Sequence, residues 1–509
     1  MKPTNDLFLL VKSLSKSEKR YFKLAMSLQK GNKIYMQVFD IIEKQKEYNE
    51  EAIKQKFKGE ALLNQFHVRK NQLYNLILKS MRGYYANSSA ATKLRGQLMD
   101  AELLYGKALY DQAKKVIAKA KKTARQYEHF EILLELLKFE MLASGRAYKS
   151  IKAERENILS KVNSIYQYEF LNIKMFLLFL KEGFIKNPGS LKSLKNIISE
   201  KVMLKDFKRE THEMKFYYYN IYSYYSDMQG DFEDSYRYMK KALEAVESKA
   251  YMQNESVYSS NYITTLANLY STCVRIKKYD EAHAITNKIL GFPDASPHNI
   301  RKIVIPHYVN ILDWYLQTGK FEDGIKYFDT IKILLDKVDA YHLTHGTSTV
   351  LYYNMAQIYF GMARYSDALH WIEKMLNETE TDIREDAHSS ARILKLIILY
   401  EMNSERMERW MQRNKKFISS KSRLFTVEKI MFEFFGKILP KLYTRKETSE
   451  AYRELKIKID KTLSPEKKQV LDEYFDFSSW VEAKIGNVPF AEIIKKKAAT
   501  YPFPPLHIQ

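Results

Sequence analysis

Residues 352–376 read YYNMAQIYFGMARYSDALHWIEKML, and the fold of the whole chain follows from this stretch. Apolar residues recur at helical spacing on both sides of a short break, which predicts two amphipathic helices joined by a tight turn. Ala356 and Tyr359 face one way on the first helix, and Ala368 and Ile372 line the second. The small side chain of Ala368 lets the two helices approach closely. One such pair cannot bury its own apolar face, so it requires neighbours.

The neighbours are copies of the same pattern, each counted from an asparagine. Packing residues stand at +2 and +5, an aromatic residue at +11 and a small residue at +14. These positions hold Leu312, Tyr315, Phe321 and Gly324 after Asn310, and Tyr270, Cys273, Tyr279 and Ala282 after Asn268. The copy after Asn220 carries a one-residue insertion in its turn, and a weaker copy follows Asn172. From Asn172 to Asn354 the five asparagines are 48, 48, 42 and 44 residues apart.

This series of aromatic, small and apolar positions resembles the tetratricopeptide-repeat (TPR) pattern, most clearly in residues 216–376, although its period exceeds the usual one of about 34 residues. The resemblance implies helix–turn–helix units stacked into a right-handed superhelical α-solenoid. We therefore expect an all-α chain in three parts: a basic N-terminal helical unit (1–90), a TPR-like α-solenoid (91–425), and a C-terminal helical cap with an extended tail (426–509). Residues 86–92, ANSSAAT, are expected to form a loop or linker.

Composition agrees with an all-helical chain. Only 16 Gly and 11 Pro occur in 509 residues, and no apolar run approaches the roughly 18 residues that a membrane span requires. The apolar patch at residues 7–11 is too short for a signal peptide. The single Cys273 excludes an internal disulfide framework. These features favour a cytoplasmic, bacterial protein.

The formal charge of +22 has two interpretations. A polyanionic partner such as nucleic acid or the ribosome would be attracted through counterion release. Alternatively, the lysines belong to solvated faces of an extended helical surface, which we favour because they are spread along the chain. A short helix, a turn at Gly59 and a long basic helix could mimic a helix-turn-helix reader, or could dock on the first repeat. The candidate nucleic-acid contacts are Arg69 and Lys70 on that long helix, and Lys114, Lys115 and Lys122 on a second basic helix.

The repeated asparagines are the main candidate for a binding site. They stand away from the seam between paired helices, so we expect them to face the concave groove of the superhelix together with the residues at +3 and +7. An asparagine amide offers both a donor and an acceptor to an extended peptide backbone. The predicted peptide-binding residues are Asn172, Asn220, Asn268, Asn310, Asn354, Arg275, Asp313, Gln317, Tyr353 and Gln357. The alternative is that these amides bridge adjacent helices and set the repeat geometry.

Signals for catalysis or cofactors are poor. His342 and His345 form an H-x-x-H without a third ligand or a glutamate base at metal-site spacing. No phosphate loop, nucleophile elbow or activated thiol is recognisable. We therefore expect a non-catalytic protein or peptide-binding adaptor or regulator that needs no cofactor, with a nucleic-acid- or ribosome-associated protein as the alternative. A helix starting at Ser464 and an extended segment at residues 501–505 are expected in the cap.

Overall fold

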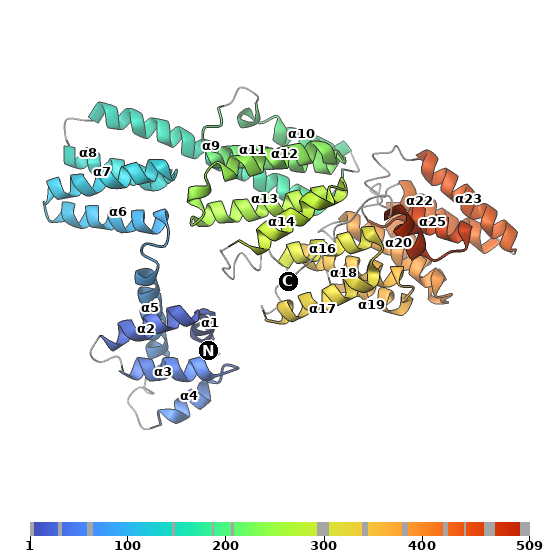
Figure 1. The fold of residues 1–509 in the computed structure, drawn as a ribbon, viewed down its shortest axis with the longest axis horizontal. Coiled ribbons are helices and arrows are strands. Elements are labelled where there is room, and N and C mark those ends of the chain that lie inside the picture. The colour runs from blue at the N-terminus through green and yellow to red at the C-terminus, as the bar shows by residue number, and fades with distance from the viewer. Residues whose placement is uncertain are drawn as a thin grey trace. The chain divides into compact units, whose positions relative to one another are not determined.

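The computed structural model describes residues 5–28, 33–58, 65–144, 148–185, 188–204, 208–292, 305–337, 345–378, 385–420, 426–441, 444–462 and 474–498, and every regular element in these ranges is helical (Figure 1). The prediction of an all-α chain is thus confirmed for these ranges. The chain divides into two compact units, Met1–Leu159 and Ser160–Gln509. Across the same ranges, the structure contains no helix whose length and apolar character suit it to crossing a membrane.

The first unit begins with a small helical bundle. Its helices are α1 (Asp6–Ser13), α2 (Lys16–Ser27), α3 (Lys33–Lys44), α4 (Glu50–Lys56) and α5 (Phe66–Tyr84). They enclose a core that includes Phe22, Phe39 and Ile77. A capping box formed by Ser15 and Glu18 starts α2, and the Asn49 side chain accepts the Ala52 backbone N–H to start α4. These caps satisfy backbone donors that the helices themselves leave unpaired.

The remainder of the first unit consists of α6 (Ala90–Gly106), α7 (Tyr110–Gln126), α8 (Phe130–Ser144) and the beginning of α9 (Tyr148–Glu182), which continues into the second unit. The predicted loop at residues 86–92 is therefore too long. Ser89 is the N-cap of α6 and exchanges hydrogen bonds with Thr92, so Ala90 already lies in the first turn. Serine and threonine are typical of both loops and helix starts, and composition alone does not separate the two.

The second unit is mainly an array of paired helices. They are α10 (Pro188–Ile198), α11 (His212–Gln229), α12 (Phe232–Glu247), α13 (Ser256–Arg275), α14 (Tyr279–Leu290), α16 (Ile305–Thr318), α17 (Phe321–Lys337), α18 (His345–Gly361), α19 (Tyr365–Glu378), α20 (Glu385–Glu401) and α21 (Arg406–Ser420), with the short 3₁₀ turns η2 (Lys201–Met203) and η3 (Ala250–Met252). From α11 to α14 and from α16 to α21, each helix packs against the next, and α13, α16, α18 and α20 also contact one another in sequence order.

The small residues predicted at +14 are buried at the contact between paired helices, as expected. Ser235, Ala282 and Ala368 are each at most 2% exposed. At Gly324 a Cβ would lie 3.1 Å from the Tyr315 Cβ and 3.2 Å from the Ile358 Cδ1, so a larger residue would force the helices apart. Close packing at this position therefore sets the separation of α16, α17 and α18.

A left-handed residue recurs in the turns that follow α6, α7, α11, α13, α16, α18 and α20. Positive φ angles occur at Ala108, Glu128, Gly230, Lys277, Gly319, Ala363 and Asn403. In each case the next residue donates its N–H to a carbonyl five residues earlier, for example Lys278 to Cys273 (2.8 Å) and Arg364 to Tyr359 (2.9 Å). This is the 6→1 hydrogen bond of a Schellman motif, and it satisfies carbonyls at the helix end. The same turn thus closes helices in both units.

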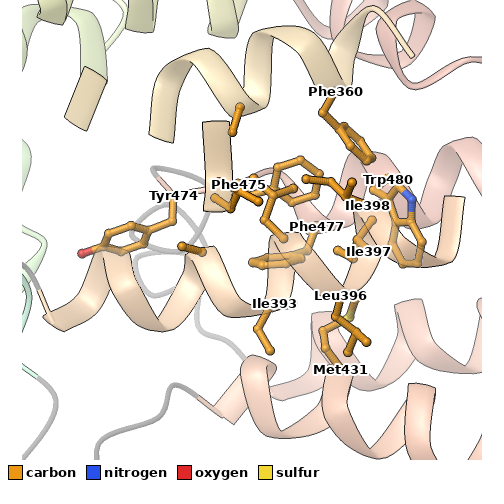
Figure 2. Packing of buried hydrophobic residues seen from close by; sticks show 14 of the residues in the cluster. Phe360, Ile393, Leu396, Ile397, Ile398, Met431, Tyr474, Phe475, Phe477 and Trp480 are labelled. Atoms are coloured by element: carbon orange, nitrogen blue, oxygen red, sulfur yellow. The ribbon is translucent and has the colours of Figure 1, made fainter. Parts of the chain in front are cut away.

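The C-terminal helices pack on α20. They are α22 (Thr426–Glu433), the π-helical segment η6 (Phe434–Ile438), the 3₁₀ turn η7 (Leu439–Lys441), α23 (Arg445–Thr462), α25 (Phe477–Gly486) and α26 (Phe490–Ala498). Figure 2 shows Ile397 and Ile398 of α20 within the same apolar cluster as Phe477 and Trp480 of α25. The Trp480 indole N–H also donates to the Glu401 carboxylate, 2.7 Å away.

Helix α26 reaches further back along the array. It packs against α16. The rings of Phe490 and Phe360 meet edge-to-face with their centroids 5.5 Å apart. The Phe490 ring also stacks nearly parallel to the Phe475 ring at the same distance. The C-terminal helices therefore cover apolar side chains of α18 as well as α20, which is compatible with the predicted cap. The predicted helix start at Ser464 and the segment at residues 501–505 lie outside the described residues.

Replacing the left-handed Ala363 by glycine tests the turn. Glycine adopts positive φ without the steric cost that an L side chain meets, so Ala363→Gly is expected to raise the free energy of unfolding by about 0.5–1 kcal/mol. Ala284→Gly, at an exposed position inside α14, is the control and is expected to lower it by about 1 kcal/mol. Denaturant unfolding measures both. Equal destabilisation by the two substitutions would contradict the assigned turn geometry.

Candidate functional site

The five asparagines lie on successive first helices of the array. Asn172 is on α9, Asn220 on α11, Asn268 on α13, Asn310 on α16 and Asn354 on α18. Each amide from Asn220 onward donates a hydrogen bond to the preceding first helix. The acceptors are Asn172 Oδ1 for Asn220 (2.6 Å), Tyr224 Oη for Asn268 (3.5 Å), Ser271 Oγ for Asn310 (3.1 Å) and Asp313 Oδ1 for Asn354 (2.6 Å). We call these residues the asparagine row.

The acceptors explain why the register repeats. Ser271 and Asp313 both stand at +3 of the previous copy, so Asn310 and Asn354 bridge adjacent first helices in the same way. Buried amides need such partners because an unpaired one costs about 1–3 kcal/mol. These contacts favour the alternative interpretation, in which the amides set the repeat geometry. A direct role of the row in peptide binding remains a prediction.

The row retains some capacity for an external ligand. Asn268 and Asn310 are half-buried, and among the described residues their Oδ1 atoms have no hydrogen-bond partner. Asn220 and Asn354 are only 3% and 4% exposed. Two amide acceptors therefore remain within reach of a peptide N–H group, rather than five.

The other predicted groove residues divide into paired, buried and accessible ones. Arg275 forms an ion pair with Asp227 at 3.3 Å, and Gln317 accepts a hydrogen bond from the Tyr279 hydroxyl at 3.2 Å. Burial raises the pKa of Asp227, and Arg275 opposes that shift. Tyr353 lies in the hydrophobic core, so its ring is not offered to a partner as expected. Gln357 is half-buried, and within the described residues nothing bonds to its amide.

Gly361, at +7 after Asn354, serves packing instead of a groove. A Cβ at this position would lie 2.4 Å from the Phe321 ring. The end of α18 therefore approaches α17 so closely that only a hydrogen fits there. The spacing of Gly361 from Asn354 predicted a small residue facing the groove. The spacing alone does not show that the Phe321 ring fills the space beside this glycine.

Lys395 marks the far end of the row, about where a sixth asparagine would fall. Its ammonium group lies 2.9 Å from the Glu373 carboxylate and 4.0 Å from the centre of the Trp410 ring. Burial would raise the pKa of Glu373, but hydrogen bonds from Lys395 and Arg406 lower it below its usual value. At this end of the row, an ion pair between α19 and α20 thus takes the place of an amide bridge between first helices.

The candidate nucleic-acid contacts are not equivalent. Lys70 is mostly buried, pairs with Glu50 and lies over the Tyr48 ring, and Arg69 donates to the Tyr35 hydroxyl at 3.0 Å. These two side chains hold α5 against its neighbours. On α7, Lys114 pairs with Asp111 at 3.6 Å.

Lys115 and Lys122 are exposed, and no residue in the described ranges pairs with either of them. Among the five candidate residues, those that remain exposed and unpaired within these ranges are therefore the two lysines on α7.

Groups that could support catalysis are few in the described ranges. Cys273 is fully buried, and burial raises the pKa of its thiol to about 12, so it stays protonated near neutral pH. Within those ranges no three His, Cys, Asp or Glu side chains are close enough to hold a metal ion. His342 and the side chain of His345 lie outside the described residues.

His307 is a buried polar residue that the sequence analysis did not single out. It is 0% exposed on α16, and its ring meets the Tyr270 ring edge-on at 4.7 Å. Within the described part of the chain, neither ring nitrogen has a hydrogen-bond partner. Burial lowers the pKa of His307 to about 3. His307 stands three positions before Asn310, and the residues three positions before Asn268 and Asn354 are also buried. This shared position in the repeat is the feature of the sequence that points to burial of His307.

The bridge between Asn354 and Asp313 is tested by a double-mutant cycle. Asn354→Ala is expected to lower the free energy of unfolding by about 1–3 kcal/mol, because it removes a buried hydrogen bond to a carboxylate. Combined with Asp313→Ala, the coupling should exceed about 0.5 kcal/mol. Gln357→Ala, on the same helix but without a partner in the described ranges, is the control and should change stability by less than about 0.5 kcal/mol. Strict additivity would contradict a structural bridge.

His307 predicts an acid-sensitive second unit. Between pH 6.5 and 3 the unfolded chain binds a proton that the folded chain excludes, so stability falls as pH falls through this range. The contribution at pH 5 is about 2 kcal/mol. His307→Leu should remove this contribution. The free energy of unfolding, measured at pH 5 and at neutral pH, should then differ less between the two pH values than it does for the natural sequence. His67→Gln, an exposed site on α5, is the control. An unchanged difference in His307→Leu would refute the assignment.

Comparison with protein-family models, with curated proteins and with solved structures gives no match for this chain. The function of this chain is therefore inferred from the geometry of the asparagine row and its surroundings.

Proposed function

We propose that this chain is a non-catalytic adaptor or regulator, in which TPR-like helix pairs between α11 and α20 form a right-handed solenoid that binds an extended segment of a partner protein. The observation that carries the proposal is the recurrence of polar side chains at matching positions on successive first helices, linked by the amide bridges of the asparagine row. Recurrent polar positions along stacked helices suit a ligand that is itself a repeating chain.

The chemistry favours a peptide backbone as the ligand. Asn268 and Asn310 present amide oxygens that are not used inside the described ranges, and Gln357 adds a complete amide on the next first helix. Peptide N–H and C=O groups are complementary to these side chains whatever the peptide sequence. Each good hydrogen bond contributes about 0.5–1.5 kcal/mol.

The expected affinity is modest. Three such bonds give at most about 4–5 kcal/mol, whereas micromolar binding requires about 8 kcal/mol. Apolar contacts must supply the difference. The half-buried Leu316 lies on α16 with Asn310, and the half-buried Tyr219 lies on α11, the first helix that precedes α13. The proposal therefore predicts a partner segment that combines an extended backbone with apolar side chains.

Selection from a displayed library of random linear peptides, followed by fluorescence anisotropy with the full chain, tests this function. Gln357→Ala is expected to weaken the selected peptides about three- to tenfold, because it removes one or two hydrogen bonds without disturbing an internal bridge. Gln253→Ala, exposed on the connection between α12 and α13, is the matched control and should leave affinity unchanged. Failure to enrich any peptide, or equal affinity in Gln357→Ala, would contradict the proposal.

A further inference from the structure

One face of α9 carries a line of exposed apolar residues, in the part of the helix that belongs to the second unit. Tyr166 is 52% exposed, Phe170 65%, Ile173 49% and Leu177 58%. They are spaced by four, three and four residues, so they form one stripe along the helix. Phe176, 40% exposed, lies beside it, and its ring also meets the Tyr224 ring of α11 at 6.0 Å. We call these residues the α9 stripe.

The opposite face of α9 packs against α11. Ile165, Tyr168, Leu171 and Met175 are buried, the Tyr168 ring meets that of Tyr218 on α11 at 6.4 Å, and Asn172 accepts the Asn220 amide. The helix is therefore held in the array by one face and presents a second apolar face to solvent. An apolar stripe of this length on a helix that is otherwise packed points to a partner.

The stripe has the spacing of a coiled-coil seam. With Phe170 and Leu177 at heptad position a, Tyr166 and Ile173 fall at d, and Asn163, which is exposed, falls at the preceding a position. A single asparagine at an a position among apolar seam residues favours pairing with another asparagine in register. Two copies of this same helix in parallel would bring their Asn163 side chains together.

The flanking charges are complementary to the same helix. Glu169 falls at position g and Lys174 at position e, five residues later. In a parallel two-stranded coiled coil, position g contacts position e of the following heptad on the partner, which is also five residues on. Glu169 of each copy would thus face Lys174 of the other. In an antiparallel pair g faces g, which would oppose two glutamates.

We propose that the α9 stripe is a dimer interface that binds the α9 stripe of a second copy in parallel, around a two-fold axis along the helices. The contact is isologous, because the same residues face one another on both copies. The self-complementary charges argue for a second copy over an unrelated amphipathic helix. This inference does not depend on the proposed peptide-binding function.

Sedimentation equilibrium of the full chain at micromolar concentration tests the dimer. The expected mass is twice 60.2 kDa. Glu169→Lys and Lys174→Glu should each weaken association about tenfold, because each replaces two attractive pairs by two repulsive ones. The double variant restores the attraction with reversed signs and should return to the affinity of the natural sequence.

Substitution in the seam provides a second test. Phe170→Glu places a charge at an exposed position that the fold of one copy does not need, so the variant should fold and sediment as a single copy. Ile457→Glu, at another exposed apolar position on α23 (52%), is the control and should remain dimeric. The proposal is overturned by a single-copy mass for the natural sequence, by a dimer that persists in Phe170→Glu, or by a double charge variant that fails to recover.

Discussion

Close approach of the paired helices is the constraint on which the rest of this structure depends. It requires a small residue fourteen positions after the asparagine, and Gly324 shows how tight the requirement is, because a Cβ there would press on Tyr315 and Ile358. Close approach also brings the first helices of successive pairs within reach of short polar side chains. The amide bridge from Asn354 to Asp313 forms only because α16 and α18 pack closely against each other.

Under the proposed function, the asparagine row serves both stability and recognition with one set of side chains. An amide between two helices must be paired when it is buried, and pairing with a specific acceptor fixes how the helices align. The same amide keeps its oxygen for another ligand where it reaches the surface, as at Asn268 and Asn310. Repeated polar positions can therefore arise from packing and still provide a regular surface for a peptide chain.

Part of the positive charge is neutralised by ion pairs within the fold. Lys70, Lys121 and Lys395 are mostly buried and pair with Glu50, Glu140 and Glu373, respectively. Removing the glutamate from such a pair would leave a mostly buried ammonium group without that partner, so these lysines stabilise the fold. Exposed lysines such as Lys115 on α7 carry charge that is not neutralised locally within the described residues. Net charge alone therefore overstates the basic surface that a polyanion could contact.

By itself the sequence determined the helical class, the caps at Ser15 and Asn49, and the common register of the small residues and the asparagines, because each depends on local spacing or on side chains a few residues apart. Other features became visible only in three dimensions. The acceptor of Asn354 lies 41 residues away, so spacing could show that the amide recurs but not what it binds. Ala363 and Lys277 adopt positive φ although neither is glycine, because the packed helices on either side fix the turn. The apolar spacing along α9 does not tell by itself which apolar face is packed and which is exposed. Only the packing of α11 on its opposite face decided that Phe170 and Leu177 remain exposed.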